Sequence, residues 1–186
     1  MTTMLSELQK QKFIKLFSMY DACSNGHLDR KDFEAIVNKA ARIKNWSSRS
    51  AKYQTLFYKY IDKWEGLEKT ASQGKNHQVT LTEWLIYHEA LIQDPQRYEA
   101  QVQEAMDLVF DIFDDDGNGE ISMEEWASFL SLYNISPVYS EFIFPILDQN
   151  QDGALHKDNL LELIRTFYFS DDPEAVGNLI FGPFRY

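Results

Sequence analysis

The chain has 186 residues, of which 44% are hydrophobic and 15% aromatic, so it can bury a sizeable core. Its net charge of −11 disfavours nucleic acid and anionic membranes as partners and favours cations. The single cysteine, Cys23, excludes an internal disulfide framework and is typical of a reducing compartment.

Eight helices are predicted from apolar residues that recur at intervals of three and four. A break is expected at Asp94-Pro95, because a residue before proline disfavours the helical conformation. Pro137 marks the start of the seventh helix. The predicted helices are centred on residues 13–20, 33–40, 53–64, 84–92, 102–113, 126–133, 137–147 and 160–167. The predicted fold class is therefore all-α.

Twelve residues separate the two helices of each successive pair, and these four segments share one pattern. It places oxygen-bearing residues at positions one, three, five, nine and twelve, a glycine at six and an apolar residue at eight. This spacing wraps oxygen ligands around a hard cation and is typical of the EF-hand calcium loop, in which position seven supplies its backbone carbonyl. We therefore predict four EF-hand helix-loop-helix units, in two pairs packed into one compact body. The loops are residues 21–32, 72–83, 114–125 and 148–159.

The first loop matches the pattern in part. Cys23 stands at position three, where a thiol is a poor ligand for a hard ion. Asp32 stands at position twelve and is one methylene shorter than the usual Glu, so it reaches an ion less well with both oxygens. A smaller cage of this kind favours Mg²⁺ relative to Ca²⁺. We predict a divalent-ion site here, with the ligands Asp21, Asn25, His27 and Asp32.

The second loop, 72–83, has lost most of the pattern. Ser72, Gly74 and Asn76 occupy positions one, three and five, His77 replaces the glycine, and Glu83 is the one carboxylate left at a ligand position. We interpret this loop as a structural remnant that pairs with the first. The stretch before it, Glu65–Gly74, is predicted to be an extended, flexible linker.

The third loop, 114–125, fills every constrained position. Gly119 allows the sharp turn at position six, and Glu125 at position twelve can close the cage with two carboxylate oxygens. The loop carries six acids, which repel one another without metal, so metal binding should contribute to folding. We predict that it binds Ca²⁺ through Asp114, Asp116, Asn118, Glu120, Ser122 and Glu125.

The fourth loop, 148–159, matches until its last residue. Asn159 stands at position twelve and offers one neutral oxygen where Glu would offer two that share a charge. Binding should be weakened and not abolished, because pairing with the third loop pre-organises the fourth. The predicted ligands are Asp148, Asn150, Asp152, Ala154 and Asn159.

These features predict an N-terminal EF-hand pair (1–94), a C-terminal pair (95–170) and an apolar tail (171–186) that packs on the core. The chain resembles sarcoplasmic calcium-binding proteins and bacterial calerythrin in its first loop ending in Asp, its eroded second loop and the long insertion between them. The tail stretch Gly177–Gly182 reads Gly-Asn-Leu-Ile-Phe-Gly and is similar to the Gly-Asn-Trp-Leu-Phe-Gly of that family. The resemblance implies two collapsed EF-hand pairs with ions in loops one, three and four. Cys23 and Asn159 depart from the family's pattern.

The function expected from these observations is Ca²⁺ buffering by a monomeric cytoplasmic protein, with Mg²⁺ competing at the weaker sites and no enzymatic activity. One alternative is a calcium sensor that opens to bind a target helix, but the chain has only 5 Met for an adaptable groove. Another is a coelenterazine-type photoprotein or luciferin-binding protein. His88 is the one His on a predicted helix, so the photoprotein pattern of His, Tyr and Trp converging on a cavity is missing. No apolar run approaches the length of a membrane span, and no secretion signal is recognisable.

Overall fold

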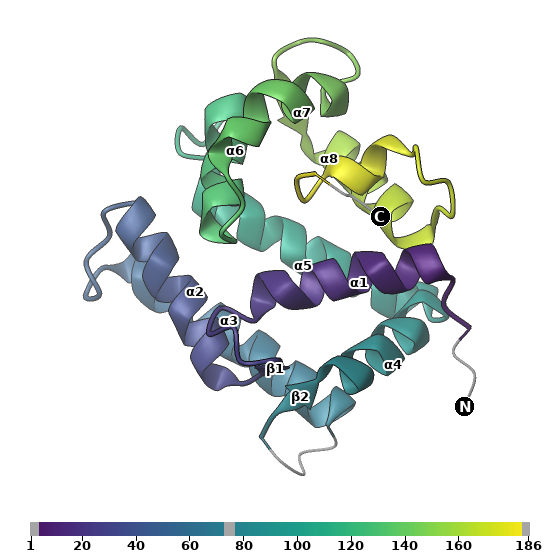
Figure 1. Ribbon diagram of the computed structural model, residues 1–186. Coiled ribbons are helices and arrows are strands. Elements are labelled where there is room, and N and C mark those ends of the chain that lie inside the picture. Colours follow the sequence, from purple (N-terminus) through teal and green to yellow (C-terminus); the bar gives the residue numbers. More distant parts are fainter. Residues whose placement is uncertain (1–3, 73–76, 184–186) are drawn as a thin grey trace. The chain divides into compact units, whose positions relative to one another are not determined.

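The computed structural model describes residues 4–72 and 77–183, and these are mostly helical, which confirms the predicted all-α EF-hand fold (Figure 1). Two short 3-10 helices, η1 (Pro137–Tyr139) and η2 (Val176–Leu179), accompany the α-helices. None of the described helices is both long and apolar enough to cross a membrane. The α-helices are α1 (Glu7–Tyr20), α2 (Arg30–Ile43), α3 (Ala51–Ala71), α4 (Leu81–Ile92), α5 (Pro95–Phe113), α6 (Met123–Leu132), α7 (Ser140–Leu147) and α8 (Lys157–Phe169).

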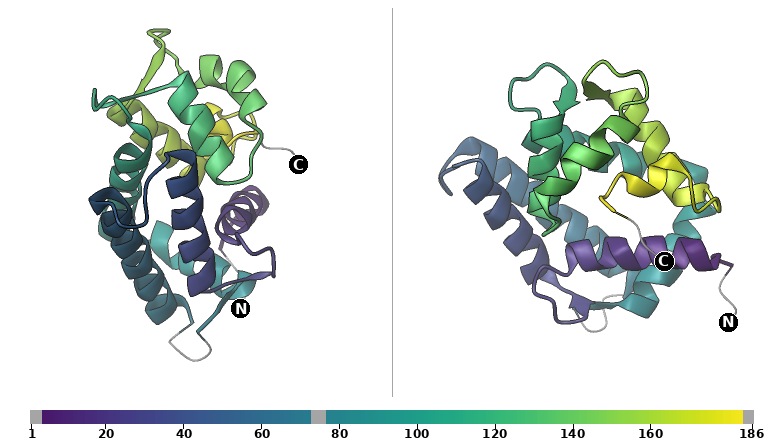
Figure 2. Two further views of the ribbon diagram at one scale, coloured as in Figure 1. Left: turned by 90° about the vertical axis from the view of Figure 1, so that its left-hand side faces the viewer. Right: turned by 45° about the horizontal axis from the view of Figure 1, so that its top comes forward.

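Short antiparallel strands pair the first loop with the second and the third with the fourth. The apolar residues at position eight face each other, Leu28 opposite Val79 and Ile121 opposite Leu155. All four are at most 1% exposed, so each strand pair is anchored in a core. The loops of the second pair lie side by side in Figure 2 (right). The strands are β1 (His27–Leu28), β2 (Val79–Thr80), β3 (Glu120–Ser122) and β4 (Ala154–His156).

Three of the helices that follow a loop begin with the same reciprocal cap. The position-nine side chain accepts a hydrogen bond from the backbone N–H of position twelve, and the position-twelve carboxylate accepts one from the backbone N–H of position nine. Helix α8 differs, because His156 precedes it and forms no side-chain cap. The capping pairs are Asp29 with Asp32 before α2, Thr80 with Glu83 before α4, and Ser122 with Glu125 before α6.

The chain divides into two units, with the boundary between Gln93 and Asp94. Asp94 begins α5 by accepting a hydrogen bond from the backbone N–H of Arg97 at 3.1 Å, and Pro95 is the first helical residue. Ser6–Lys12, which the sequence analysis assigned to the N-terminal pair, groups with the second unit instead. The physical reason is that Lys12 Nζ donates a hydrogen bond to the carbonyl of Ser170 at 2.7 Å, beside the end of α8.

Aromatic side chains dominate the core of the first unit. The indole N–H of Trp84 donates to the carbonyl of Phe13 at 2.8 Å, which ties α4 to α1 inside the core. The Trp84 ring also packs near Phe17, and the Phe33 ring lies 5.3 Å from that of Trp64. These rings bury large areas and fix the helices that flank the first two loops.

The prediction that Glu65–Gly74 is an extended, flexible linker is wrong over most of this stretch, because α3 continues as a helix to Ala71. Trp64 and Leu67 are buried on this last stretch, and their burial outweighs the cost of about 1 kcal/mol for a glycine such as Gly66 in a helix. Gly74 and Asn76 lie outside the described residues. The seventh helix begins as predicted at Pro137, first as η1 and from Ser140 as α7.

The tail of the chain packs inside the second unit. The ring of Phe181 lies 6.2 Å from Phe129 of α6 and 4.9 Å from Phe167 of α8, measured between centroids. Ile180 is 3% exposed, and η2 contacts both α7 and α8. The tail therefore fills the apolar face between the helices of this pair. Phe184, also assigned to this apolar tail, lies outside the described residues.

Candidate metal centres

The third loop is shaped by hydrogen bonds to its first ligand residue. Asp114 accepts from the backbone N–H of Asn118 and from that of Gly119, each at 3.0 Å, one on each carboxylate oxygen. Gly119 has a φ of +80°, the left-handed conformation that glycine adopts without strain. The chain therefore turns back over Asp114 at position six, as the ion cage requires.

Glu125 closes the same loop from its far end. Its Oε1 accepts from the backbone N–H of Asp115 at 2.8 Å, and its Oε2 accepts from the N–H and the hydroxyl of Ser122 at 2.8 and 2.9 Å. Oε1 has two lone pairs and accepts one hydrogen bond, so it keeps acceptor capacity for a cation. These contacts hold the Glu125 side chain at the end of the loop.

Three carboxylates converge in this loop. Asp114, Asp116 and Glu125 each bring an oxygen to within 4.8 Å of the other two, and among the described residues this is the one such group of acidic, His or Cys side chains. Three negative charges this close repel one another unless a cation lies between them. The donors are hard oxygens, which suit Ca²⁺. The residues present therefore fit a calcium ion.

The other predicted ligands of the third loop lie around this group. Asn118 donates from its side-chain amide to Asp116 Oδ2 at 3.1 Å, and its Oδ1 accepts from the backbone N–H of Glu120 at 2.8 Å. Glu120 lies in β3, and the Ser122 hydroxyl is bonded to Glu125. Positions one to twelve are thus brought together as the spacing predicted, although their roles as ligands stay a prediction.

The fourth loop contains a buried carboxylate oxygen with no partner. Asp148 is 6% exposed, and its Oδ2 accepts from the backbone N–H of Gly153 at 2.8 Å. Its Oδ1 is buried and receives no hydrogen bond. A buried acceptor left unsatisfied costs about 1–3 kcal/mol, and more when it is charged. A cation bound at position one would supply the missing interaction, so this loop also fits a metal ion.

Of the remaining predicted ligands of the fourth loop, some lie in the loop and its strand, and Asn159 lies at the start of α8. The side-chain amide of Asn150 donates to Asp152 Oδ2 at 2.8 Å, and Ala154 lies in β4. Asn159 is exposed at the start of α8 and lines a half-open cavity of about 290 Å³ together with Glu162 of the same helix and Val176 of η2. The structure therefore places Asn159 beside the tail, and its role as a ligand of loop four stays a prediction.

His156, at position nine of the fourth loop, is a residue that the sequence reasoning missed. One ring nitrogen lies 2.6 Å from Asp152 Oδ2, and the other lies 3.3 Å from Glu120 Oε1 of the third loop. The hydrogen bond with Asp152 raises the pKa of His156 and lowers the pKa of Asp152. The available signal was the strand register, which places Glu120 directly opposite His156. His156 therefore links the two loops through their side chains.

The first loop repeats the fold of the third but not its convergence of carboxylates. Asp21 accepts from the N–H groups of Asn25 and Gly26, both at 2.9 Å, just as Asp114 does in its own loop. Asp32 is fully buried, and its two oxygens accept from the backbone N–H groups of Cys23 and Asp29 at 2.9 and 2.8 Å. Loop one has Cys23 where loop three has the acid Asp116, and among the described residues its acids do not form a group as close as that of loop three.

The other predicted residues of the first pair have mainly local roles. His27 lies in β1, where its carbonyl is at the predicted position seven, and its ring is 3.8 Å from Asp29. Ser72 is buried at the end of α3, and Glu83 caps α4 through two hydrogen bonds from Thr80, both at 2.8 Å. The prediction that the second loop pairs with the first is confirmed by the strand pairing.

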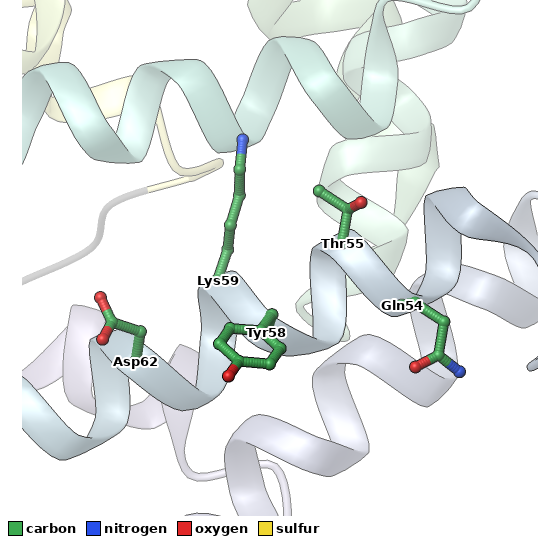
Figure 3. A pocket seen from close by; sticks show the side chains of 5 residues that line it. All are labelled: Gln54, Thr55, Tyr58, Lys59 and Asp62. Atoms are coloured by element: carbon green, nitrogen blue, oxygen red, sulfur yellow. The ribbon is translucent and has the colours of Figure 1, made fainter.

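A hollow of about 610 Å³ lies away from the loops, along α3 (Figure 3). Tyr58 in its lining is 80% exposed, and the lining side chains all come from one helix. An open surface of this kind presents no converging donors, and we assign no site to it. Its lining residues are Gln54, Thr55, Tyr58, Lys59 and Asp62.

Comparison with known proteins agrees with this geometry. The family model described as EF hand matches residues 106–130, which include the third loop. Calerythrin of Saccharopolyspora erythraea is 26% identical over 177 residues, covering 94% of this chain and 100% of that protein. The luciferin-binding protein of Renilla reniformis is 24% identical, covering 87% of this chain and 86% of that protein.

A solved structure shares the fold over nearly the whole length. The sarcoplasmic calcium-binding protein from amphioxus superimposes with a TM-score of 0.79 at 20% identity, covering 97% of this chain and 100% of that one. The carboxylate cage of loop three, the paired loops and these similarities lead to one conclusion. The chain is a calcium-binding EF-hand protein, and over nearly its whole length it is similar to calerythrin and to sarcoplasmic calcium-binding proteins.

Proposed function

We propose that this protein is a cytoplasmic, monomeric calcium buffer. Loop three is its strongest site, loop four a weaker one, and loop one a site at which Mg²⁺ competes with Ca²⁺. The carboxylate group of loop three and the unsatisfied Asp148 Oδ1 support the first two assignments. The lone cysteine, Cys23, supports a reducing compartment.

The observation that carries the proposal is the position of the tail. A sensor EF-hand pair must expose an apolar groove between its helices when calcium binds. Here Phe181 already occupies that space between Phe129 and Phe167. A tethered segment competes at high effective concentration with any outside peptide. The tail therefore favours a pair that stays closed, as a buffer does.

The tail is held by specific contacts as well as by apolar burial. A Cβ at Gly177 would lie 2.4 Å from the carbonyl oxygen of Leu163, so η2 approaches α8 as closely as a glycine allows. The Asn178 amide donates to the carbonyls of Asp172 and Pro173 at 3.0 and 2.9 Å. These contacts make the tail a fixed part of the second unit's core.

The proposed competition by Mg²⁺ at loop one rests on Asp32. Mg²⁺ prefers a six-coordinate cage and retains water, whereas Ca²⁺ accepts the two oxygens of a Glu at position twelve. Asp32 is one methylene shorter than the Glu125 of loop three, and it does not belong to a close carboxylate group such as the one in that loop. A smaller ion with several retained waters suits that geometry better.

A role without catalysis is part of the proposal. His88, the one His on a helix, is 3% exposed, and one of its ring nitrogens lies 2.9 Å from the carbonyl oxygen of Trp84. Its ring packs 4.1 Å from Trp84 and 4.7 Å from Phe13. These contacts are those of a core side chain, which supports a structural role for His88 over binding of a coelenterazine-type substrate.

The deciding experiment measures exposed apolar surface during a calcium titration. A dye that fluoresces on apolar surface is added to metal-free protein, and calcium is then titrated. A buffer should lose fluorescence as its pairs tighten. Deletion of Gly177–Tyr186 should raise dye binding in the calcium-loaded state. A sharp rise of fluorescence with calcium in the intact, fully helical protein would support the sensor instead.

Ion preference is measured separately by calorimetry. Metal-free protein is titrated with calcium in the presence and absence of Mg²⁺. The proposal expects loop-three binding to change little with Mg²⁺ and the weakest calcium site to be displaced. Identical titrations with and without Mg²⁺ would contradict the assignment of loop one.

A further inference from the structure

Helix α7, together with η1, carries apolar side chains on every side. Its inner face buries Ile143, Phe144 and Leu147 in the second unit. The opposite face is exposed to solvent, at 59% for Val138, 40% for Tyr139, 66% for Phe142 and 48% for Ile146. We call these four residues the α7 stripe.

The spacing of the α7 stripe makes it a continuous apolar ridge. Phe142 and Ile146 are four residues apart on α7, and positions four apart lie above one another on one side of an α-helix. Val138 belongs to η1, which leads directly into α7. Glu141 is the one charged residue between Pro137 and Leu147. A helix that is apolar all round is normally covered on all sides, and contiguous exposed apolar surface marks interaction sites.

The net charge of the second half of the chain indicates which kind of partner would bind the α7 stripe. Residues 94–186 contain 19 acidic and 4 basic residues, a net charge of −15, whereas residues 1–93 contain 10 acidic and 14 basic residues, a net charge of +4. Two bound Ca²⁺ ions would offset only four of the negative charges. The exposed Glu141 lies on α7 itself, and the exposed Asp158 belongs to the loop that follows α7 and is not one of its predicted ligands. The partner that fits this surface is therefore cationic.

A second copy of the chain fits less well. It would bring the same net charge of −15 to the same face, and like charges oppose association. Four side chains of this size expose on the order of 400 Å², about half of what each partner of a stable dimer contributes. An anionic bilayer is disfavoured by the same charge.

We propose that the α7 stripe docks a cationic amphipathic helix of another protein. Such a helix would place apolar residues, spaced three and four apart, against Val138, Phe142 and Ile146, and its Lys and Arg side chains beside exposed acids such as Glu141 and Asp158. The stripe is on the outer face of α7, away from the tail, so docking does not require the EF-hand pair to open. The partner would hold the calcium-binding protein at one place in the cell.

The test uses the full chain and a labelled synthetic peptide of leucine and lysine that forms an amphipathic helix. Binding is measured by fluorescence anisotropy at saturating calcium. Phe142→Ser and Ile146→Ser should each weaken peptide binding about tenfold, as loss of an anchor side chain does. Both residues are exposed, so circular dichroism of both variants should match that of the unaltered chain. Ile86→Ser is the matched control, because Ile86 is 54% exposed on α4, in the other unit.

The outcomes separate the possible occupants. Weaker binding in both stripe variants, with unchanged binding in Ile86→Ser, supports the docking surface. Equal affinity in all four proteins would mean that the peptide is held by general charge, and the proposal would be overturned. A dimer in sedimentation that Phe142→Ser abolishes, without peptide binding, would identify the stripe as a self-interface and also overturn it.

Discussion

Glu125→Gln tests the assignment of loop three as the dominant site. The carboxylate holds two sets of contacts, from the Asp115 N–H on Oε1 and from Ser122 on Oε2. Glutamine keeps one oxygen and places an NH₂ group where the other stood. That donor then faces the N–H of either Asp115 or Ser122, so the substitution removes a charged ligand and disturbs the start of α6 together.

The magnitude follows from the contacts that are lost. A hydrogen bond to a charged group contributes about 1.5–3 kcal/mol, and an N-terminal helix cap about 1 kcal/mol. A loss of about 3 kcal/mol in calcium binding corresponds to a Kd on the order of 100-fold higher. Loop three is expected to bind with a Kd of about 10⁻⁸ to 10⁻⁶ M, the range of buffers and sensors, so the variant should bind at about 10⁻⁶ to 10⁻⁴ M.

The assay is calorimetric titration of metal-free protein with calcium, with Glu124→Gln as the matched control. Glu124 is the neighbouring, exposed acid at a position that supplies no ligand, and its substitution removes the same charge. The control should change the Kd by less than about fivefold, as expected for an exposed charge. If Glu125→Gln keeps the full tight stoichiometry, or if both variants weaken binding equally, loop three is not the dominant site as assigned.

Three further outcomes are expected. Asn159→Glu restores a two-oxygen ligand at position twelve, so the calcium affinity of loop four should rise in calorimetry while the other sites barely change; equal affinities would show that position 159 is not a ligand. Removal of metal by a chelator should lower the melting temperature, because one site at calcium a thousandfold above its Kd stabilises the fold by about 4 kcal/mol; an unchanged melting temperature would contradict this coupling. In metal-free protein the pKa of His156 should lie above its ordinary value of about 6.5, since Asp152 stabilises the protonated ring. This pair then stabilises the metal-free fold most between about pH 4 and 6.5, and the effect is lost as pH rises through the raised pKa of His156 or falls through the lowered pKa of Asp152. Calcium at Asp152 should lower the pKa of His156 in an NMR titration, so loop four should bind more weakly as pH falls; a pKa that ignores calcium would refute the link.

Much of the fold could be predicted because its signals are local. The spacing of Asp114, Gly119 and Glu125 fixes a loop by itself, and the apolar residue at position eight fixes which loops pair. The rest depends on contacts between distant residues. The helical end of α3 depends on burial of Leu67, which no local pattern of Gly and polar residues reveals. The grouping of Ser6–Lys12 with the second unit depends on Lys12 reaching Ser170, a contact between residues 158 positions apart.

In the candidate metal sites too, some residues could be predicted from the sequence and others could not. The residues of loop three could be chosen from sequence because each position has one chemical role. The loop pairing places Glu120 opposite His156, but the sequence does not give the ring orientation that brings both Asp152 and Glu120 into contact with His156. The buried, unpartnered Asp148 Oδ1 is likewise a property of packing.

The missing cap before α8 affects where the second unit opens first. In helices α2, α4 and α6 the N–H of the third residue is bonded to the side chain that precedes the helix, whereas α8 begins after His156 without such a bond. Unsatisfied amides at a helix start exchange with solvent through small local openings. An ion in loop four would order the residues directly before that start. Calcium should therefore increase the protection of backbone amides from hydrogen exchange most in the opening turn of α8. At loop four, a bound ion would stabilise the start of a helix that has no capping side chain.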